Sequence, residues 1–193
     1  MRSRNELGSF LNSHGLTGMG VELGVFAGVF SEIILSTWTG KKLFLVDAWR
    51  SVPGYVDFLR RTDKLCIDTR KTHEAEWELI FQECSTRVDR FDGRVGILRM
   101  TTTDASMAFD DASLDFVYVD ADHSKVGVAR DLREWYPKLK TGGLFAGHDY
   151  FNGNRKGIMF GVKSAVDEFA ASVGKGVQAT NETHTMKTWY WFK

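Results

Sequence analysis

VELGVFAGVFS, residues 21–31, is the stretch that decides the fold. It begins as an apolar β-strand, turns at Gly24 and Gly28, and continues into a segment typical of a helix. Glycines at such a turn let a ligand lie close to the backbone, and the N–H groups at the start of a helix attract polar or anionic groups. The stretch predicts a cofactor-binding corner, although glycine turns after apolar strands also arise for packing reasons alone.

The residue between the two glycines narrows the cofactor class. A dinucleotide-binding corner needs a glycine at the position of Phe26, because the backbone approaches a pyrophosphate there. Phe26 therefore argues against a nicotinamide dehydrogenase. An acidic strand residue, here Glu22, followed by glycines four residues apart resembles instead the corner with which methyltransferases hold S-adenosylmethionine.

Length and composition indicate one domain. The chain has 193 residues and 43% of them are hydrophobic, which is enough for one sizeable core and too little for two ordinary domains and a linker. We expect a single domain over residues 1–193. Lys and Arg together number 25, as do Asp and Glu, so net charge favours neither a nucleic acid nor a membrane as partner.

Targeting signals and cysteines add two expectations. Neither a signal-peptide core nor a membrane span is present in the sequence, so we expect a cytoplasmic protein. The two cysteines, Cys66 and Cys84, lack the spacing of a metal site, and we expect free thiols. The oligomeric state stays open, and a homodimer is compatible with the sequence.

Short apolar runs alternate with longer amphipathic segments along the chain. We expect strands at 19–23, 42–46, 95–100, 114–119 and 144–146. We expect helices at 31–37, 73–90, 105–109, 125–139 and 162–173. This alternation predicts an α/β fold, a Rossmann-like, doubly wound and mostly parallel sheet with helices on both faces and ligands at the carboxyl ends of the strands. Segments at 176–180 and 187–192 predict a C-terminal antiparallel hairpin.

The connection at 50–93 is longer than one crossover helix requires. Excess chain at the ligand edge of a sheet is usually functional or disordered. Two interpretations stay open, a substrate-side insertion or lid and an extra helix packed on the outside. Tyr55, Trp77 and Phe81 in this segment suit sugars, phenols or a peptide without choosing among them.

An acidic residue ends the second expected strand. Asp47 is placed where a carboxylate accepts hydrogen bonds from the two hydroxyls of a ribose, and the glycine corner before it favours this role over that of a turn or capping aspartate. Trp49 follows two residues later. It borders the adenosine of a bound cofactor or belongs to the core.

Carboxylates and imidazoles follow two further strands. Asp120, Asp122 and His123 follow one strand, and His148 and Asp149 follow the next. In a parallel sheet these side chains converge beside the cofactor. Such oxygen-rich clusters hold Mg²⁺ or Mn²⁺, and imidazole shifts the preference towards Mn²⁺ or other transition ions.

Each of these residues also has a structural alternative. Asp122 or Ser124 caps the helix that begins near Lys125, which is the interpretation we favour for Asp122. His148 is either a metal ligand or a core histidine. His123 suits a general base for a substrate hydroxyl, because the ordinary pKa of imidazole is near neutrality.

Taken together, the motifs resemble class I S-adenosylmethionine-dependent methyltransferases, in particular the small-molecule branch called the methyltransferase 24 family. The resemblance covers most of the chain outside 50–93. Its motifs are E-x-G-V-F-x-G, V-D-x-W, L-D-F-V-Y-V-D-A-D-H, D-L-x-x-W-x-P-K-L-K-x-G-G, G-H-D-Y and, at 161–169, G-V-K-x-A-V-D-E-F.

The resemblance implies a seven-stranded sheet with a reversed terminal hairpin, and it implies a set of cofactor contacts. The residues expected to contact S-adenosylmethionine are Glu22, Gly24, Phe26, Gly28, Ser31, Asp47, Trp49, Thr102 and Asp120. Of these, Thr102 is expected near the adenine.

Related metal-dependent sugar and macrolide O-methyltransferases imply catalytic roles. By this resemblance Asp120 and Asp149 become ligands of Mg²⁺ or Mn²⁺, and His123 becomes the base. His148 stands where those enzymes carry an acid, which makes it the third expected ligand. The expected reaction is methyl transfer to a hydroxyl oxygen of a small-molecule acceptor, with His123 and Asp120 as catalytic residues. Two alternatives stay open, metal-independent N- or O-methylation and a cofactor-binding protein without catalysis.

Overall fold

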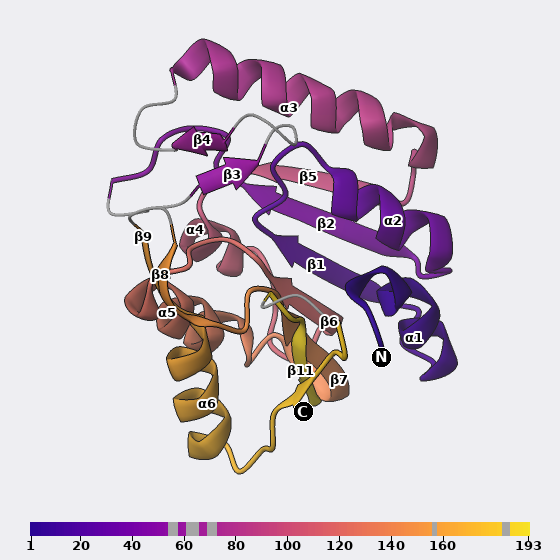
Figure 1. Cartoon of the computed structure of the whole chain (residues 1–193). Coiled ribbons are helices and arrows are strands. Elements are labelled where there is room, and N and C mark those ends of the chain that lie inside the picture. Colours follow the sequence, from indigo (N-terminus) through magenta and orange to yellow (C-terminus); the bar gives the residue numbers. More distant parts are fainter. Residues whose placement is uncertain (54–57, 61–65, 69–72, 156–157, 183–185) are drawn as a thin grey trace.

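The computed structural model describes residues 1–53, 58–60, 66–68, 73–155, 158–182 and 186–193. Its centre is a seven-stranded sheet of order β10-β11-β7-β6-β1-β2-β5 (Figure 1). The strands are β1 (Met19–Leu23), β2 (Lys42–Asp47), β5 (Val95–Arg99), β6 (Leu114–Val119), β7 (Leu139–Gly147), β10 (Gln178–Ala179) and β11 (Trp189–Phe192). The pairs from β5 to β7 are parallel, and β11 runs antiparallel to both β7 and β10. The predicted α/β sheet with its reversed terminal hairpin is confirmed.

Helices cover both faces of the sheet, as predicted (Figure 1). One face carries α1 (Leu7–Ser13), α2 (Val29–Thr37) and α3 (Glu74–Val88), preceded by the 3-10 turn η1 (Arg4–Glu6) and followed by η2 (Asp89–Phe91). The other carries α4 (Thr102–Ser106), α5 (Lys125–Trp135) and α6 (Val162–Ser172). Each set of helices closes one buried apolar cluster against the sheet.

The register of the central strands brings the candidate residues to one edge. β6 is buried at all six positions, as expected for a parallel strand covered on both faces. Glu22 of β1 lies opposite Tyr118 of β6, both strands end one residue later, and Gly24 and Asp120 follow directly. β2 pairs with β1 on the other side and ends in Asp47. The carboxyl ends of β1, β2 and β6 therefore meet at the same edge.

Two helices differ most from their expected bounds, and local chemistry explains both. The helix expected at 125–139 ends at Trp135, because Pro137 lacks the N–H group that the next helical hydrogen bond would need. β7 accordingly begins at Leu139, before the expected 144. The helix expected at 105–109 is α4 at Thr102–Ser106, because the Thr101 hydroxyl accepts the Asp104 N–H and so caps an earlier start.

The long connection at 50–93 contains the crossover helix and additional chain. α3 leads into β5 and buries Trp77, Ile80, Cys84 and Val88 in the core. The additional chain lies between β2 and α3 and includes the strand pair β3 (Phe58–Arg60) and β4 (Cys66–Asp68). Trp77 is thus a core residue, and Tyr55 lies outside the described residues. The lid role of this segment stays a prediction.

Elements outside the sequence expectations are α1, the β3–β4 pair and the antiparallel pair β8 (Asn152–Arg155) and β9 (Ile158–Gly161). The terminal Trp189, Tyr190 and Trp191 are buried and belong to the core. Cys84 is a free, buried thiol, whereas the side chain of Cys66 lies outside the described part of the structure. Among the described residues, no helix combines the length and apolar character needed to cross a membrane.

Candidate functional site

The glycine corner between β1 and α2 is shaped by left-handed backbone. Gly24, Phe26 and Gly28 have φ values of 83°, 54° and 75°. A Cβ atom on Gly24 would lie 2.1 Å from the backbone oxygen of Asp120, and one on Gly28 would lie 2.9 Å from Sγ of Cys84. Close packing within the chain therefore requires both glycines, independently of any ligand. The contact at Gly24 also joins the corner to the end of β6.

Asp47 holds this corner in place. Its Oδ2 accepts the N–H groups of Val25 at 3.0 Å and Phe26 at 2.9 Å, and its Oδ1 accepts that of Trp49 at 2.8 Å. Burial raises the pKa of Asp47, and these backbone hydrogen bonds offset part of the rise. Because two carboxylate oxygens offer about four acceptor positions, the predicted ribose contact is compatible with this bonding and stays a prediction.

Trp49 supports the corner from within the core. Its indole is fully buried, its Nε1 donates to the Phe26 carbonyl at 2.8 Å, and its ring packs edge-on against Phe81 with centroids 5.0 Å apart. Of the two interpretations left open by the sequence, the structure shows the core residue. The side chain has no exposed surface in this structure, and the predicted contact of Trp49 with the adenosine stays a prediction.

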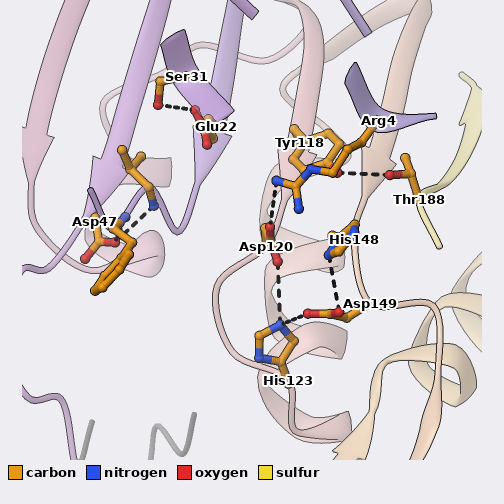
Figure 2. A network of polar contacts seen from close by, with 12 residues as sticks. Arg4, Glu22, Ser31, Asp47, Tyr118, Asp120, His123, His148, Asp149 and Thr188 are labelled. Atoms are coloured by element: carbon orange, nitrogen blue, oxygen red, sulfur yellow. Dashed lines mark hydrogen bonds and ion pairs between the residues drawn. The ribbon is translucent and has the colours of Figure 1, made fainter. Parts of the chain in front are cut away.

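Glu22 and Ser31 form a buried pair beside the corner (Figure 2). The Ser31 hydroxyl donates to Oε2 of Glu22 at 2.5 Å. Burial raises the pKa of Glu22 to about 8, although the bond from Ser31 and the charge of Arg4 lower it. Glu22 is therefore mostly protonated at neutral pH, and its contact and that of Ser31 with the cofactor stay predictions.

Thr102 forms hydrogen bonds within the fold. Its hydroxyl donates to Oδ1 of the buried Asp131 at 2.7 Å, and its carbonyl accepts the indole N–H of Trp135 at 3.1 Å. These bonds tie α4 to α5. The adenine contact implied for Thr102 stays a prediction, with its side chain already engaged.

A cluster of acids and imidazoles forms where β6 and β7 end (Figure 2). His123 Nε2 lies 2.6 Å from Oδ2 of Asp149 and 3.5 Å from Oδ1 of Asp120. One atom from each of these three residues lies within 4.8 Å of the others. The sequence thus located this convergence, which follows from two neighbouring parallel strands ending at one edge.

Asp149 lies between two imidazoles. Its Oδ2 faces His123, and its Oδ1 lies 3.2 Å from Nδ1 of His148. Burial by itself raises the pKa of Asp149, but the hydrogen bonds and charges of the two histidines outweigh it and hold the pKa well below the usual range. Asp149 is therefore an anion.

The group that could hold a metal differs from the predicted one. Asp120, His123 and Asp149 form it, and His123 takes the place expected for His148. His148 contacts Asp149 at the oxygen turned away from His123. Asp149, the residue after His148, has left-handed backbone with a φ of 50°. Two carboxylates and one imidazole are donors that suit Mg²⁺ or Mn²⁺, so the residues present fit such an ion.

The loop that carries His123 is fixed on both sides. Asp122 accepts the Ser124 N–H at 2.8 Å and the Ser124 hydroxyl at 3.0 Å, and Ser124 itself caps α5. On the other side, Gly161 donates its N–H to the His123 carbonyl at 2.9 Å, and the Phe160 ring stacks on the imidazole at 4.7 Å. The cap is Ser124, with Asp122 supporting it. The β8–β9 pair, absent from the expectations, supplies the stacking ring.

Arg4 is a residue of the site that sequence reasoning missed. Its Nη2 lies 3.3 Å from Oδ2 of Asp120 (Figure 2). Its guanidinium carbon lies 3.9 Å from the centre of the Phe30 ring. It comes from η1, far from every motif in sequence. No sequence signal points to it, because only the packing of η1 against α2 brings it to this edge.

Comparison with known proteins assigns the family. The model of the methyltransferase 24 family, described as a methyltransferase domain, matches residues 21–150. The chain belongs to this methyltransferase family. The matched range runs from β1 to the residue after Asp149 and so contains the corner and the acid and imidazole cluster. The cofactor of this class is S-adenosylmethionine, as predicted.

Solved structures share the fold of this methyltransferase at low sequence identity. The O-methyltransferase NovP is 17% identical with a TM-score of 0.65, over 98% of this chain and 77% of that one. An O-methyltransferase from Bacillus cereus in complex with S-adenosylhomocysteine is 12% identical with a TM-score of 0.63, over 98% and 80%. An rRNA methylase from Streptococcus thermophilus is 12% identical with a TM-score of 0.56, over 94% of each chain. No curated protein matches the sequence.

Replacing Gly24 by alanine tests the contact between the corner and β6. We expect Gly24→Ala to lower the free energy of unfolding by about 2 kcal/mol or more, because the new Cβ meets the rigid backbone oxygen of Asp120 as well as an unfavourable φ. Gly142→Ala is the matched control, since Gly142 has a φ of 80° and open space around it. Denaturant unfolding of both variants gives the comparison, and equal losses would contradict a restrictive contact at Gly24.

The raised pKa of Glu22 predicts a pH-dependent stability. The pKa is about 8 in the folded protein and about 4.3 in an unfolded chain, so between these values the folded state retains a proton that the unfolded state has lost. The free energy of unfolding therefore falls as the pH rises, by about 2 kcal/mol from pH 6 to pH 8 for this group.

Glu22→Gln isolates this effect, because the amide oxygen still accepts the Ser31 hydroxyl and no longer titrates. We expect the variant to lose less stability than the native protein over the same pH range in denaturant unfolding. Asp131, whose pKa burial raises to about 7, contributes equally to both proteins. Identical pH profiles would show that Glu22 does not hold its proton.

Proposed function

We propose that this methyltransferase transfers the methyl group of S-adenosylmethionine to a hydroxyl oxygen of a small molecule, with His123 as the general base. The observation that supports this most directly is the 2.6 Å approach of His123 Nε2 to Asp149 at the edge where β6 and β7 end. A buried imidazole beside a carboxylate anion is suited to accept a proton, since the carboxylate stabilises the imidazolium that forms.

The reaction moves one methyl group and one proton. Bound S-adenosylmethionine supplies a methyl group on a positively charged sulfur. The acceptor O–H bond breaks, its proton goes to His123, and the new O–C bond forms as the S–C bond breaks. The stacking of Phe160 and the bond from Gly161 hold His123 still during this transfer, and such fixed geometry supplies much of an enzyme's rate.

A divalent ion on Asp120 and Asp149 is the second part of the proposal. It would orient the acceptor oxygen and lower the pKa of its hydroxyl. The 4.8 Å clustering of Asp120, His123 and Asp149 supports this part. The ion pair between Arg4 and Asp120 instead favours metal-independent transfer, because the guanidinium already supplies positive charge to the same carboxylate. Both forms need His123.

A small acceptor is proposed from the charge of the chain. A methyltransferase acting on rRNA needs positive charge to contact phosphates, and this chain has a formal net charge of zero. Solved structures with this fold are named as an O-methyltransferase and as an rRNA methylase, so the fold itself does not determine the acceptor. Release of S-adenosylhomocysteine with phenols, sugars and rRNA as acceptors tests the choice directly.

We expect His123→Ala to lower kcat by about 10² to 10⁴, the usual contribution of a positioned base, and to leave the affinity for S-adenosylhomocysteine nearly unchanged. His14→Ala is the control, because His14 is an exposed histidine directly after α1. The measurement is turnover with the best acceptor from the panel and titration calorimetry with S-adenosylhomocysteine. Normal turnover in His123→Ala would remove His123 from the reaction.

Metal dependence has its own test. If the ion is part of the site, Mn²⁺ added to chelator-treated protein should give heat in titration calorimetry, Asp149→Asn should abolish that heat, and chelation should stop turnover. Glu168→Gln is the control, since Glu168 is an exposed acid on α6 paired with Lys125. Full turnover in the presence of a chelator would support the metal-independent alternative.

A further inference from the structure

We propose that Arg4 binds the carboxylate of the methionine part of S-adenosylmethionine, and that the cofactor's amino acid group replaces the ion pair between Arg4 and Asp120. The inference rests on the proposed use of this edge for S-adenosylmethionine. The pair lies at the carboxyl end of β6 directly beside Gly24, because the Gly24 backbone lies against the Asp120 carbonyl. The side chains of Arg4 and Asp120 are 24% and 18% exposed, so a ligand can reach both.

Charge complementarity points to an amino acid as the occupant. An α-amino carboxylate carries a cation and an anion a few ångströms apart, and the Nη2 of Arg4 lies 3.3 Å from Oδ2 of Asp120. On binding, the ammonium pairs with Asp120 and the carboxylate with Arg4, so neither protein charge loses its partner. This exchange avoids leaving a partly buried charge unpaired, which is the main cost of breaking such a pair.

The rest of this edge suits the positive end of the cofactor and not its carboxylate. Glu22, Asp120 and Asp149 all interact electrostatically with Arg4. Asp120 and Asp149 attract an ammonium and a sulfonium and repel a carboxylate, whereas Glu22 is mostly protonated and adds little charge. A guanidinium among them therefore supplies the attraction that the carboxylate requires, with two parallel N–H donors matched to its two oxygens.

Arg4 is also held ready for this contact. Its guanidinium lies 3.9 Å from the centre of the Phe30 ring, on the first turn of α2. Its backbone N–H donates to Oε1 of Glu182 at 2.9 Å, and the Asn181 N–H donates to the Arg2 carbonyl at 3.2 Å. Contacts on two sides of η1 reduce the conformational freedom that binding would otherwise cost.

The test uses ligands that differ in the amino acid group. S-adenosylmethionine and S-adenosylhomocysteine carry the carboxylate, decarboxylated S-adenosylmethionine lacks only the carboxylate, and 5′-methylthioadenosine lacks the whole amino acid. Titration calorimetry of each ligand with the native protein and with Arg4→Gln gives the affinities. Arg2→Gln is the matched control, because Arg2 is an exposed arginine in the same segment.

We expect Arg4→Gln to weaken the binding of the two carboxylate ligands about 10- to 100-fold, the range of a charge-assisted hydrogen bond. The affinities of decarboxylated S-adenosylmethionine and 5′-methylthioadenosine should change little, and Arg2→Gln should bind all four ligands like the native protein. Arg4→Lys should bind the carboxylate ligands more tightly than Arg4→Gln and less tightly than the native protein, because lysine keeps the positive charge but lacks the two parallel N–H donors of a guanidinium.

Three results would overturn the inference. Unchanged affinities in Arg4→Gln would show that Arg4 does not contact the cofactor, and equal losses for all four ligands would show that Arg4 acts through the fold of the corner. Unchanged cofactor affinity with a raised KM for an anionic acceptor would assign Arg4 to the acceptor. If the native protein binds none of the four ligands, the proposed function itself fails, which is a separate outcome from the other three.

Discussion

The site depends on the close approach of the Gly24 backbone to the carbonyl of Asp120. This approach joins the corner after β1 to the end of β6, and a side chain at Gly24 would prevent it. Asp47 fixes the same corner from β2 by accepting two of its N–H groups. Three neighbouring strands thus set the relative positions of the corner and of the acid and imidazole cluster, with no freedom for a loop to move one without the other.

Burying several acidic side chains at one edge of the sheet lowers the stability of the fold, and a different neighbouring group stabilises each acid. Glu22 stays protonated next to Ser31, and Asp47 accepts hydrogen bonds from backbone N–H groups that offset part of the burial-induced rise in its pKa. Asp149 lies between two imidazoles, and Asp120 faces the guanidinium of Arg4. These differences separate the roles of chemically similar side chains. Glu22 and Asp47 maintain the corner, whereas Asp120 and Asp149 face groups that can exchange partners or protons.

Membership in the methyltransferase family and the choice of acceptor rest on different parts of the molecule. The family match ends at residue 150 and includes all strands that carry the cluster. The chain between β2 and α3 and the β8–β9 pair lie after strands of the sheet, where insertions do not disturb the core. Similar folds occur in proteins named as an O-methyltransferase and as an rRNA methylase, so the shared fold does not fix the acceptor.

The sequence by itself determined the α/β sheet, its reversed terminal hairpin and the meeting of Asp120, His123 and Asp149, because apolar periodicity sets the strands and parallel strands end at a common edge. Only the tertiary structure decided that Trp49 belongs to the core and that His148 contacts the Asp149 oxygen turned away from His123. It also decided that Arg4 forms an ion pair with Asp120. The first two positions lie at or next to left-handed backbone, at Trp49 and Asp149, and the third is a contact between residues more than one hundred positions apart. Local sequence patterns do not predict these features, because they arise from tertiary packing.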